Sequence, residues 1–179
     1  MKPVAAVVQM TSGDTVADNL AVAARWLAAA KAGGAVLAVL PENFALMPRN
    51  DAARRAAAEP EGSGPIQGFL AETAARLGLW IVGGTIPVTV AGDARPAACC
   101  PVYDAAGRTV ASYDKIHLFD VDLPGRAERY RESDHISPGG KVALVDTPIG
   151  RVGLSVCYDM RFPELYREMV SAGAEVFTI

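Results

Sequence analysis

Short apolar runs alternate with segments of helical period in the first half of the chain, and this alternation most constrains the fold. The runs at 4–10, 36–40 and 80–85 have the length and branched composition of buried strands. Between them, apolar residues recur every three to four positions over 20–30 and again over 69–77. The order strand, helix, strand, helix, strand predicts a parallel sheet with right-handed crossovers.

Turn-forming residues mark where these elements begin and end. Asp14 or Thr15 can cap the first helix, and Gly33-Gly34 supplies its stop. An alanine-rich segment at 49–58 predicts a further helix, which the turn residues of 59–65 end. Gly83-Gly84, inside the third strand, predicts the close approach of a neighbouring backbone or side chain.

The second half of the chain has a different order of predicted elements. The runs at 97–103 and 109–113 flank a short glycine-containing connection and predict a hairpin, as do those at 142–146 and 151–156. The sheet is therefore expected to be mixed. A helix over 162–172 leads into a strand over 174–179, and we expect the long loop at 117–140 to be functional.

Composition restricts the class of protein and of partner. The chain has 179 residues, of which 51% are hydrophobic, so we expect one domain spanning 1–179. Its net charge of -3 without long runs of like charge argues against nucleic-acid and membrane partners and favours a small-molecule ligand. The first apolar run is too short for a signal peptide or a membrane span, so we expect a cytoplasmic protein.

The sequence predicts neither a metal nor a cofactor. Three cysteines, two of them adjacent, and two histidines match no metal-ligand spacing and no disulfide framework. No glycine-rich phosphate or dinucleotide motif follows a predicted strand. Cys99 and Cys100 lie in a predicted strand, so their side chains should face opposite ways and serve in packing.

Cys157 ends a short apolar run at the point where a helix-like pattern begins, and it is our candidate nucleophile. A thiol at such a switch lies near the positive end of a helix dipole, which favours the thiolate. Glu42 and Lys115 end apolar runs in the same way. Because ligands bind where the strands of an open α/β sheet end, the three can meet.

A carboxylate, a permanent cation and a soft nucleophile suffice for acyl transfer. Each residue also has an ordinary interpretation when taken alone. Glu42 can be a solvated loop side chain or a helix cap, Lys115 a surface charge, and Cys157 an inert core cysteine. The set of three is more specific than its members.

Three segments resemble the signature regions of the nitrilase, or carbon-nitrogen hydrolase, superfamily. They are Pro-Glu at 41–42, Tyr-Asp-Lys-Ile-His-Leu-Phe-Asp at 113–120, and Gly-Leu-Ser-Val-Cys-Tyr-Asp-Met-Arg-Phe-Pro-Glu-Leu at 153–165. Within the superfamily, the segments at 115–125, 131–133 and 157–165 resemble the Nit branch, which contains deaminated-glutathione amidase and ω-amidase. Pro163 favours the former type.

The resemblance implies a four-layer α-β-β-α sandwich, which usually pairs into homodimers. Family members extend by roughly another third beyond the last residue of this chain, so we expect a chain truncated at its C-terminus. Truncation would leave an edge strand and an apolar face uncovered.

The resemblance also implies a reaction without metal or cofactor, in which a primary amide becomes an acid and ammonia through a cysteine thioester. Glu42 would be the base for Cys157, and Lys115 with the backbone N–H of Tyr158 would hold the oxyanion. By the same resemblance, Glu132 would be a second acid that orients Lys115 or the substrate. An ordinary surface loop charge is the alternative for Glu132.

Other residues near these segments have less specific roles. His117 or His135 could replace Glu42 as the base, although packing or substrate shaping is favoured for His117. Asp159, Arg161 and Glu164 are expected to form a structural charge network behind Cys157, and Arg161 could instead bind a substrate carboxylate.

Two alternatives to this amidase stay open at this stage. The substrate could be that of another member of the superfamily, since pocket shape decides among nitriles, amides and carbamoyl compounds. The favoured class is the primary amide of a small dicarboxylic or peptide-like acid. A non-catalytic domain that binds a small molecule or a protein is the other possibility.

Overall fold

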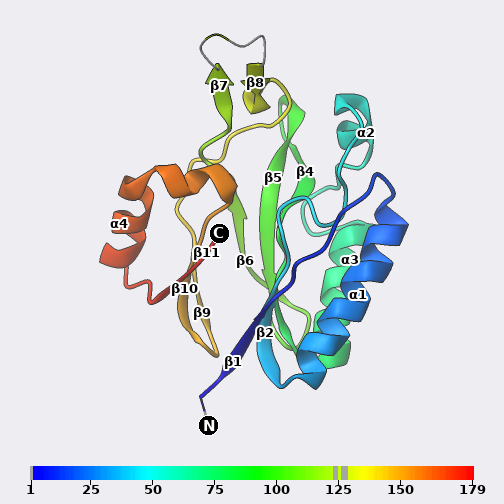
Figure 1. The fold of residues 1–179 in the computed structure, drawn as a ribbon, viewed down its shortest axis with the longest axis vertical. Helices are drawn as coiled ribbons and strands as arrows, with labels where there is room; N and C mark the ends of the chain where they lie inside the picture. The colour runs from blue at the N-terminus through cyan, green and yellow to red at the C-terminus, as the bar shows by residue number, and fades with distance from the viewer. Residues whose placement is uncertain (1, 123–124, 126–128) are drawn as a thin grey trace.

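Two β-sheets lie face to face in the computed structural model, which describes residues 2–122, 125 and 129–179 (Figure 1). The first sheet has the order β1 (Val4–Val7), β2 (Ala35–Val39), β3 (Trp80–Val82), β5 (Asp93–Tyr103) and β4 (Ile86–Val90), and β6 (Thr109–Asp114) also pairs with β5. The second sheet has the order β11 (Val176–Thr178), β10 (Gly150–Leu154) and β9 (Leu144–Thr147).

Helices cover the outer face of each sheet, as Figure 1 shows. Helices α1 (Val16–Ala32) and α3 (Pro65–Leu77) lie on the first sheet, and α4 (Pro163–Ser171) lies on the second. Helix α4 approaches its sheet closely, because Met169 lies against Gly153 of β10 and Tyr166 packs edge-on against Phe177. The layers therefore follow the predicted order α-β-β-α.

Two apolar cores separate these layers. One lies between the first sheet and its helices and includes Leu27, Leu70 and Cys99. The other lies between the sheets and includes Val152 and Cys100. The adjacent cysteines thus face opposite cores, which confirms the prediction that they serve in packing.

Strand directions confirm the mixed sheet. β1, β2 and β3 pair in parallel, as the alternation with helices predicts, whereas β5 pairs antiparallel with β3, β4 and β6. The second predicted hairpin forms from β9 and β10, and β11 joins β10 in parallel. Helix α2 (Asp51–Ala56) forms within the alanine-rich segment and is shorter than the predicted helix over 49–58.

Strand β4 was not predicted from the sequence. This strand follows the third strand almost directly and contains Pro87 and Thr89, which weakens its apolar pattern. Proline is tolerated in β4 because the strand lies at the edge of the sheet.

The prediction that the first strand is buried was wrong. β1 is an edge strand that pairs with β2, and Val7 is 84% exposed. Only Val8, just past the strand, is fully part of the core. Composition alone cannot tell an edge strand from a central one.

The predicted loop at 117–140 contains regular structure. Strands β7 (Asp120–Asp122) and β8 (Arg129–Arg131) form a small hairpin, and a 3-10 helix, η1, spans Glu132–Asp134. Strands this short carry no measurable periodicity, which explains the omission. Residues 123–124 and 126–128 of the segment lie outside the described residues.

No helix in the described part of the chain has the length and apolar composition that a membrane span requires.

Candidate active site

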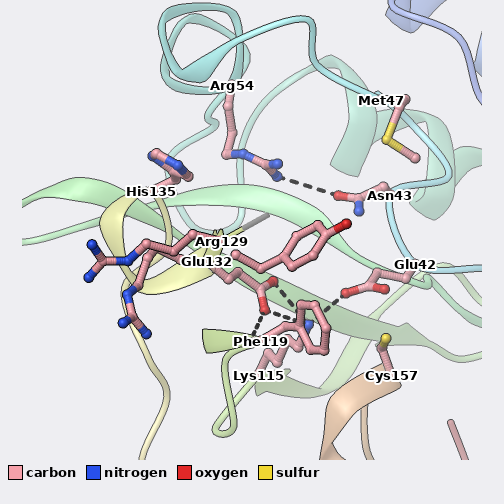
Figure 2. Close-up of a pocket in the computed structure, with 12 residues that line it drawn as sticks. Glu42, Asn43, Met47, Arg54, Lys115, Phe119, Arg129, Glu132, His135 and Cys157 are labelled. Carbon is pink, nitrogen blue, oxygen red and sulfur yellow. Dashed lines mark hydrogen bonds and ion pairs between the residues drawn. The ribbon is translucent and has the colours of Figure 1, made fainter. Parts of the chain in front are cut away.

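Glu42, Lys115 and Cys157 line one cavity of about 610 Å³ (Figure 2). They follow β2, β6 and β10 respectively, so two sheets contribute to the site. The loop residue Glu132 lines the same cavity. Its remaining lining residues are Asn43, Met47, Arg54, Phe119, Arg129, Tyr130, Arg131 and His135.

A tight turn holds Glu42 at the end of β2. Gly84 has a φ of +57°, and a Cβ atom there would collide with the carbonyl oxygen of Pro41. Asn43 also has a left-handed backbone, with a φ of +55°, and its N–H donates to Oγ1 of Thr85 at 2.8 Å. The predicted close approach at Gly83-Gly84 is therefore the contact that places Glu42 over the cavity.

Lys115 is a buried cation held between two carboxylates. Its side chain is 2% exposed, and Nζ lies 2.9 Å from Oε1 of Glu42 and 2.9 Å from each carboxylate oxygen of Glu132. Burial works to lower the pKa of Lys115, but the charges and hydrogen bonds of Glu42 and Glu132 outweigh it and raise the pKa. Lys115 is therefore an ammonium ion at neutral pH.

Glu132 connects Lys115 to the loop that carries it. The backbone N–H of Phe119 donates to Oε2 of Glu132 at 2.6 Å, in addition to the contacts with Lys115. The carboxylate is mostly covered, with 22% of the side chain exposed. The Glu132 carboxylate therefore contacts both Lys115 and a backbone N–H and is not a solvated loop charge.

Cys157 begins a five-residue 3-10 helix, η2 (Cys157–Arg161), and has a left-handed backbone with a φ of +46°. Its thiol is exposed to the cavity beside the Glu42 carboxylate (Figure 2). Partial burial and the charge of Glu42 raise the pKa of Cys157, against the opposing effect of Lys115.

The expectation that a helix dipole favours the Cys157 thiolate was therefore wrong. The element after Cys157 is a short 3-10 helix, and α4 begins only at Pro163. Burial, together with the charge of the nearby Glu42 carboxylate, raises the pKa of the thiol more than Lys115 lowers it. A neutral thiol beside a carboxylate needs a base before it can attack, and Glu42 is within the same cavity.

Asp159 is fully buried and supports the turn of Cys157. One carboxylate oxygen accepts from the N–H of Val156 at 2.8 Å and from the hydroxyl of Tyr113 at 2.7 Å. The other accepts from the backbone N–H of His117 at 3.0 Å and lies 2.7 Å from Nδ1 of His117. Asp159 thus joins the strand of Lys115 to the turn of Cys157.

The other two members of the predicted charge network lie elsewhere. Arg161 is exposed and does not line the cavity, and Glu164 pairs with Arg167 at the surface at 3.1 Å. The prediction of a three-residue network is wrong for both. Arg161 is the last residue of η2 and Glu164 lies in the first turn of α4, and both side chains are exposed to solvent there.

The two histidines and Tyr158 occupy the surroundings of the site. His117 stacks on Phe162 with ring centroids 3.7 Å apart, while Tyr158 packs edge-on against Phe119 and Phe162. His135 lines the cavity and lies 2.8 Å from a carboxylate oxygen of Asp51. His117 is therefore bound to Asp159 and to an aromatic ring rather than pointed at Cys157.

Several cavity residues were not predicted from the sequence, among them Arg54 and Asn43. Arg54 belongs to an alanine-rich segment and resembles an ordinary surface charge of a helix. Asn43 follows Glu42 directly, and this adjacency is the one signal that could have indicated it. Placing Arg54 requires the position of α2 above the cavity, which no local pattern encodes.

Comparison with known proteins gives consistent results. The model of the family described as carbon-nitrogen hydrolase matches residues 4–179. A deaminated glutathione amidase of Yersinia enterocolitica is 39% identical over 175 residues, which is 97% of this chain and 60% of that protein. An omega-amidase of Danio rerio is 36% identical over 171 residues, which is 96% of this chain and 60% of that protein.

A solved structure has the same fold. The NitFhit protein of C. elegans superposes with a TM-score of 0.85 at 32% identity, over 96% of this chain and 42% of that one. The chain spans about 60% of the length of the two curated relatives described above. The resemblance to the Nit branch is confirmed, and this chain belongs to the carbon-nitrogen hydrolase family.

Proposed function

We propose that this chain carries the reacting groups of an amidase that converts a primary amide into a carboxylic acid and ammonia. One observation carries the proposal: the buried Nζ of Lys115 lies 2.9 Å from Glu42, and both line one cavity with the thiol of Cys157. A base, a cation and a nucleophile therefore share one small space.

In the first half of the reaction, Glu42 takes the thiol proton as the sulfur of Cys157 attacks the amide carbonyl. The resulting oxyanion is stabilised by the ammonium of Lys115 and by the backbone N–H of Tyr158. One such donor is typically worth about 10²- to 10³-fold in rate. Glu42 then gives its proton to the leaving nitrogen, ammonia departs, and the acyl group stays on Cys157 as a thioester.

In the second half, Glu42 accepts a proton from water as the water attacks the thioester. Collapse of the second oxyanion breaks the carbon-sulfur bond and releases the acid, and Cys157 recovers its proton. Glu132 takes part by orienting Lys115 through two hydrogen bonds. Arg161 has no part in this scheme because it lies on the surface.

Relatives guide the choice of substrate. The Yersinia enterocolitica and Danio rerio proteins are named for deaminated glutathione and ω-amides, so amides of small dicarboxylic or peptide-like acids are the first compounds to test. A single domain over 1–179, a homodimer and a cytoplasmic location stay predictions.

Ammonia release and intact mass together test the proposal. Incubation with succinamate followed by rapid acid quenching should add the acyl mass to the chain, and Cys157→Ala should remove both the adduct and the ammonia. Glu42→Gln should abolish turnover while the thermal unfolding curve stays near that of the wild type. An adduct on the Cys157→Ala protein, or ammonia release by it, would contradict the assignment of the nucleophile.

A further inference from the structure

Arg54 differs from the other basic side chains that line the cavity in the described part of the chain. Lys115, Arg129, Arg131 and His135 each have a side-chain nitrogen within 3.3 Å of a carboxylate oxygen. Over residues 2–122, 125 and 129–179, Arg54 has no ion pair, and its one side-chain hydrogen bond is a long contact of 3.5 Å from Nη1 to the amide oxygen of Asn43.

The guanidinium of Arg54 is also partly desolvated. Its Nε is buried and has no hydrogen-bond partner among the described residues. Burial lowers the pKa of Arg54, an effect opposed by the more distant charges of Glu132, Asp51 and Glu42. A buried N–H donor without an acceptor destabilises the protein. A ligand oxygen in the cavity would accept the hydrogen bond that the protein itself does not provide, and this would favour binding.

The fold holds Arg54 in place relative to the reacting groups. Asn50 caps α2 by accepting from the N–H of Ala53 at 2.9 Å, and Asp51 pairs with His135 at 2.8 Å. The backbone N–H of His135 in turn donates to the carbonyl oxygen of Glu132 at 3.0 Å. Helix α2 is thus tied to the same loop that holds Lys115.

The two ends of the cavity differ in charge. At one end, two carboxylates, Glu42 and Glu132, surround the single ammonium of Lys115, which leaves an excess of negative charge. Arg54 reaches into the cavity from the opposite side, as Figure 2 shows. A substrate carboxylate would be repelled by the first end and attracted by the second.

We propose that Arg54 is a specificity-determining residue, which binds a carboxylate at the end of the substrate remote from the scissile amide. The planar fork of a guanidinium matches a carboxylate through two parallel hydrogen bonds. Binding there points the uncharged amide end toward Cys157. The inference rests on the proposed amidase function, and it extends that function by naming the residue that selects ω-amides of dicarboxylic acids.

A comparison of two substrates tests the inference by kinetics. Glutaramate carries the carboxylate, and valeramide, of the same chain length, ends in a methyl group instead. The ratio of their kcat/KM values should favour glutaramate in the wild type and fall about 10- to 100-fold in Arg54→Gln, mainly through KM for glutaramate. Arg54→Lys, which keeps the charge without the fork, should lie between them.

Arg55→Gln is the matched control. Arg55 is the next residue of α2, is exposed and does not line this cavity, so its replacement removes the same charge without touching the proposed contact. The substrate ratio should not change. An equal loss on both substrates in Arg54→Gln, or an unchanged ratio, would overturn the inference while leaving the amidase proposal intact.

A binding measurement separates the two proposals if turnover fails. In the Cys157→Ala chain, glutaramate binding by calorimetry should weaken at least about tenfold when Arg54→Gln is added, and not when Arg55→Gln is added. No ammonia from either substrate in the wild type would count against the amidase function alone. Absent binding, or binding of equal strength in the two double variants, would overturn the role of Arg54.

Discussion

The hydroxyl of Tyr113 donates a 2.7 Å hydrogen bond to Oδ2 of Asp159, which joins the strand that ends at Lys115 to the turn that carries Cys157. Both side chains are almost completely buried. Burial and the neighbouring carboxylate raise the pKa of Tyr113, so its hydroxyl stays a donor. The distance between the ammonium and the sulfur therefore depends on a contact that involves neither of them.

Tyr113→Phe should lower both stability and turnover. It removes one of the hydrogen bonds that the buried Asp159 carboxylate accepts, so the free energy of unfolding in urea should fall by about 1–3 kcal/mol. We expect kcat to fall with little change in KM, because substrate contacts remain. Tyr166→Phe is the control, since the Tyr166 hydroxyl contacts Ser155 and not Asp159. A wild-type kcat in Tyr113→Phe would show that the contact does not position Cys157.

Glu42→Gln should make Cys157 more reactive toward an alkylating reagent, although it abolishes catalysis. The charge of Glu42 helps to raise the pKa of the thiol, and its removal leaves the opposing effect of Lys115. The thiolate fraction at pH 8 should rise by about 3- to 10-fold. Iodoacetamide labelling measured by mass over a range of pH checks this.

The two other cysteines do not interfere with that measurement. Both are buried, and burial raises the pKa of Cys100 to about 12 and that of Cys99 further. Cys157→Ala supplies the background rate. Slower labelling of Glu42→Gln than of the wild type would contradict the electrostatic account and indicate that Glu42 acts as a base even toward this reagent.

Glu132→Gln should shift the alkaline limb of the pH–rate profile to lower pH. Glu132 and Glu42 hold the pKa of Lys115 above its ordinary value, so the ammonium persists to high pH in the wild type. Loss of one carboxylate lowers that pKa, and activity that needs the ammonium should disappear earlier as pH rises. At neutral pH, looser positioning of Lys115 should lower kcat by about 10- to 100-fold.

Asp134→Asn is the control for this variant, because Asp134 lies in the same 3-10 helix but is exposed. Its pH–rate profile should match that of the wild type. An unshifted alkaline limb in Glu132→Gln would show that the contact of Glu132 with Lys115 does not set its protonation.

Gly84→Ala should disrupt the turn that carries Glu42. A Cβ at this position collides with the backbone of Pro41, which cannot move as a flexible side chain can. Gly92→Ala is the control, since Gly92 also has a positive φ, of +79°, but open space around it. Urea unfolding should show a loss of about 1–2 kcal/mol for Gly92→Ala and more than about 4 kcal/mol for Gly84→Ala. Equal losses would mean that the close approach is not needed.

Local patterns predicted the elements whose signals are local. Helices α1 and α3 have an apolar face at helical spacing, and the hairpins β5–β6 and β9–β10 have turn residues between two apolar runs. β4 escaped prediction because a proline interrupts its pattern, and the hairpin β7–β8 because its strands are too short. The exposure of Val7 depends on which strands lie beside β1, and no residue near Val7 encodes that.

The candidate site likewise has features that could be predicted from the sequence and features that could not. Glu42, Lys115 and Cys157 could be named from the sequence because each is a reactive residue at the end of an apolar run. Their strands belong to two different sheets, so it is the packing of the sheets that brings the three together. The raised pKa of Cys157 could not be predicted from the sequence, because it arises from burial and from the charge of Glu42, which is far away in the chain. Burial and Glu42 therefore favour the thiol, whereas a local helix dipole would favour the thiolate.

Local sequence patterns were sufficient to predict the alternation of strands and helices, the positions of the three reactive residues and the family. The folded chain brings Glu132 against Lys115 and Asp159 against the turn of Cys157, for which the sequence left alternatives open, and it places Arg54 at the cavity, which no local pattern indicated. The two kinds of feature differ in the distance along the chain over which the responsible interactions act. Secondary structure follows from neighbours along the chain, whereas the charge, burial and partners of a side chain are set by segments that only folding brings together.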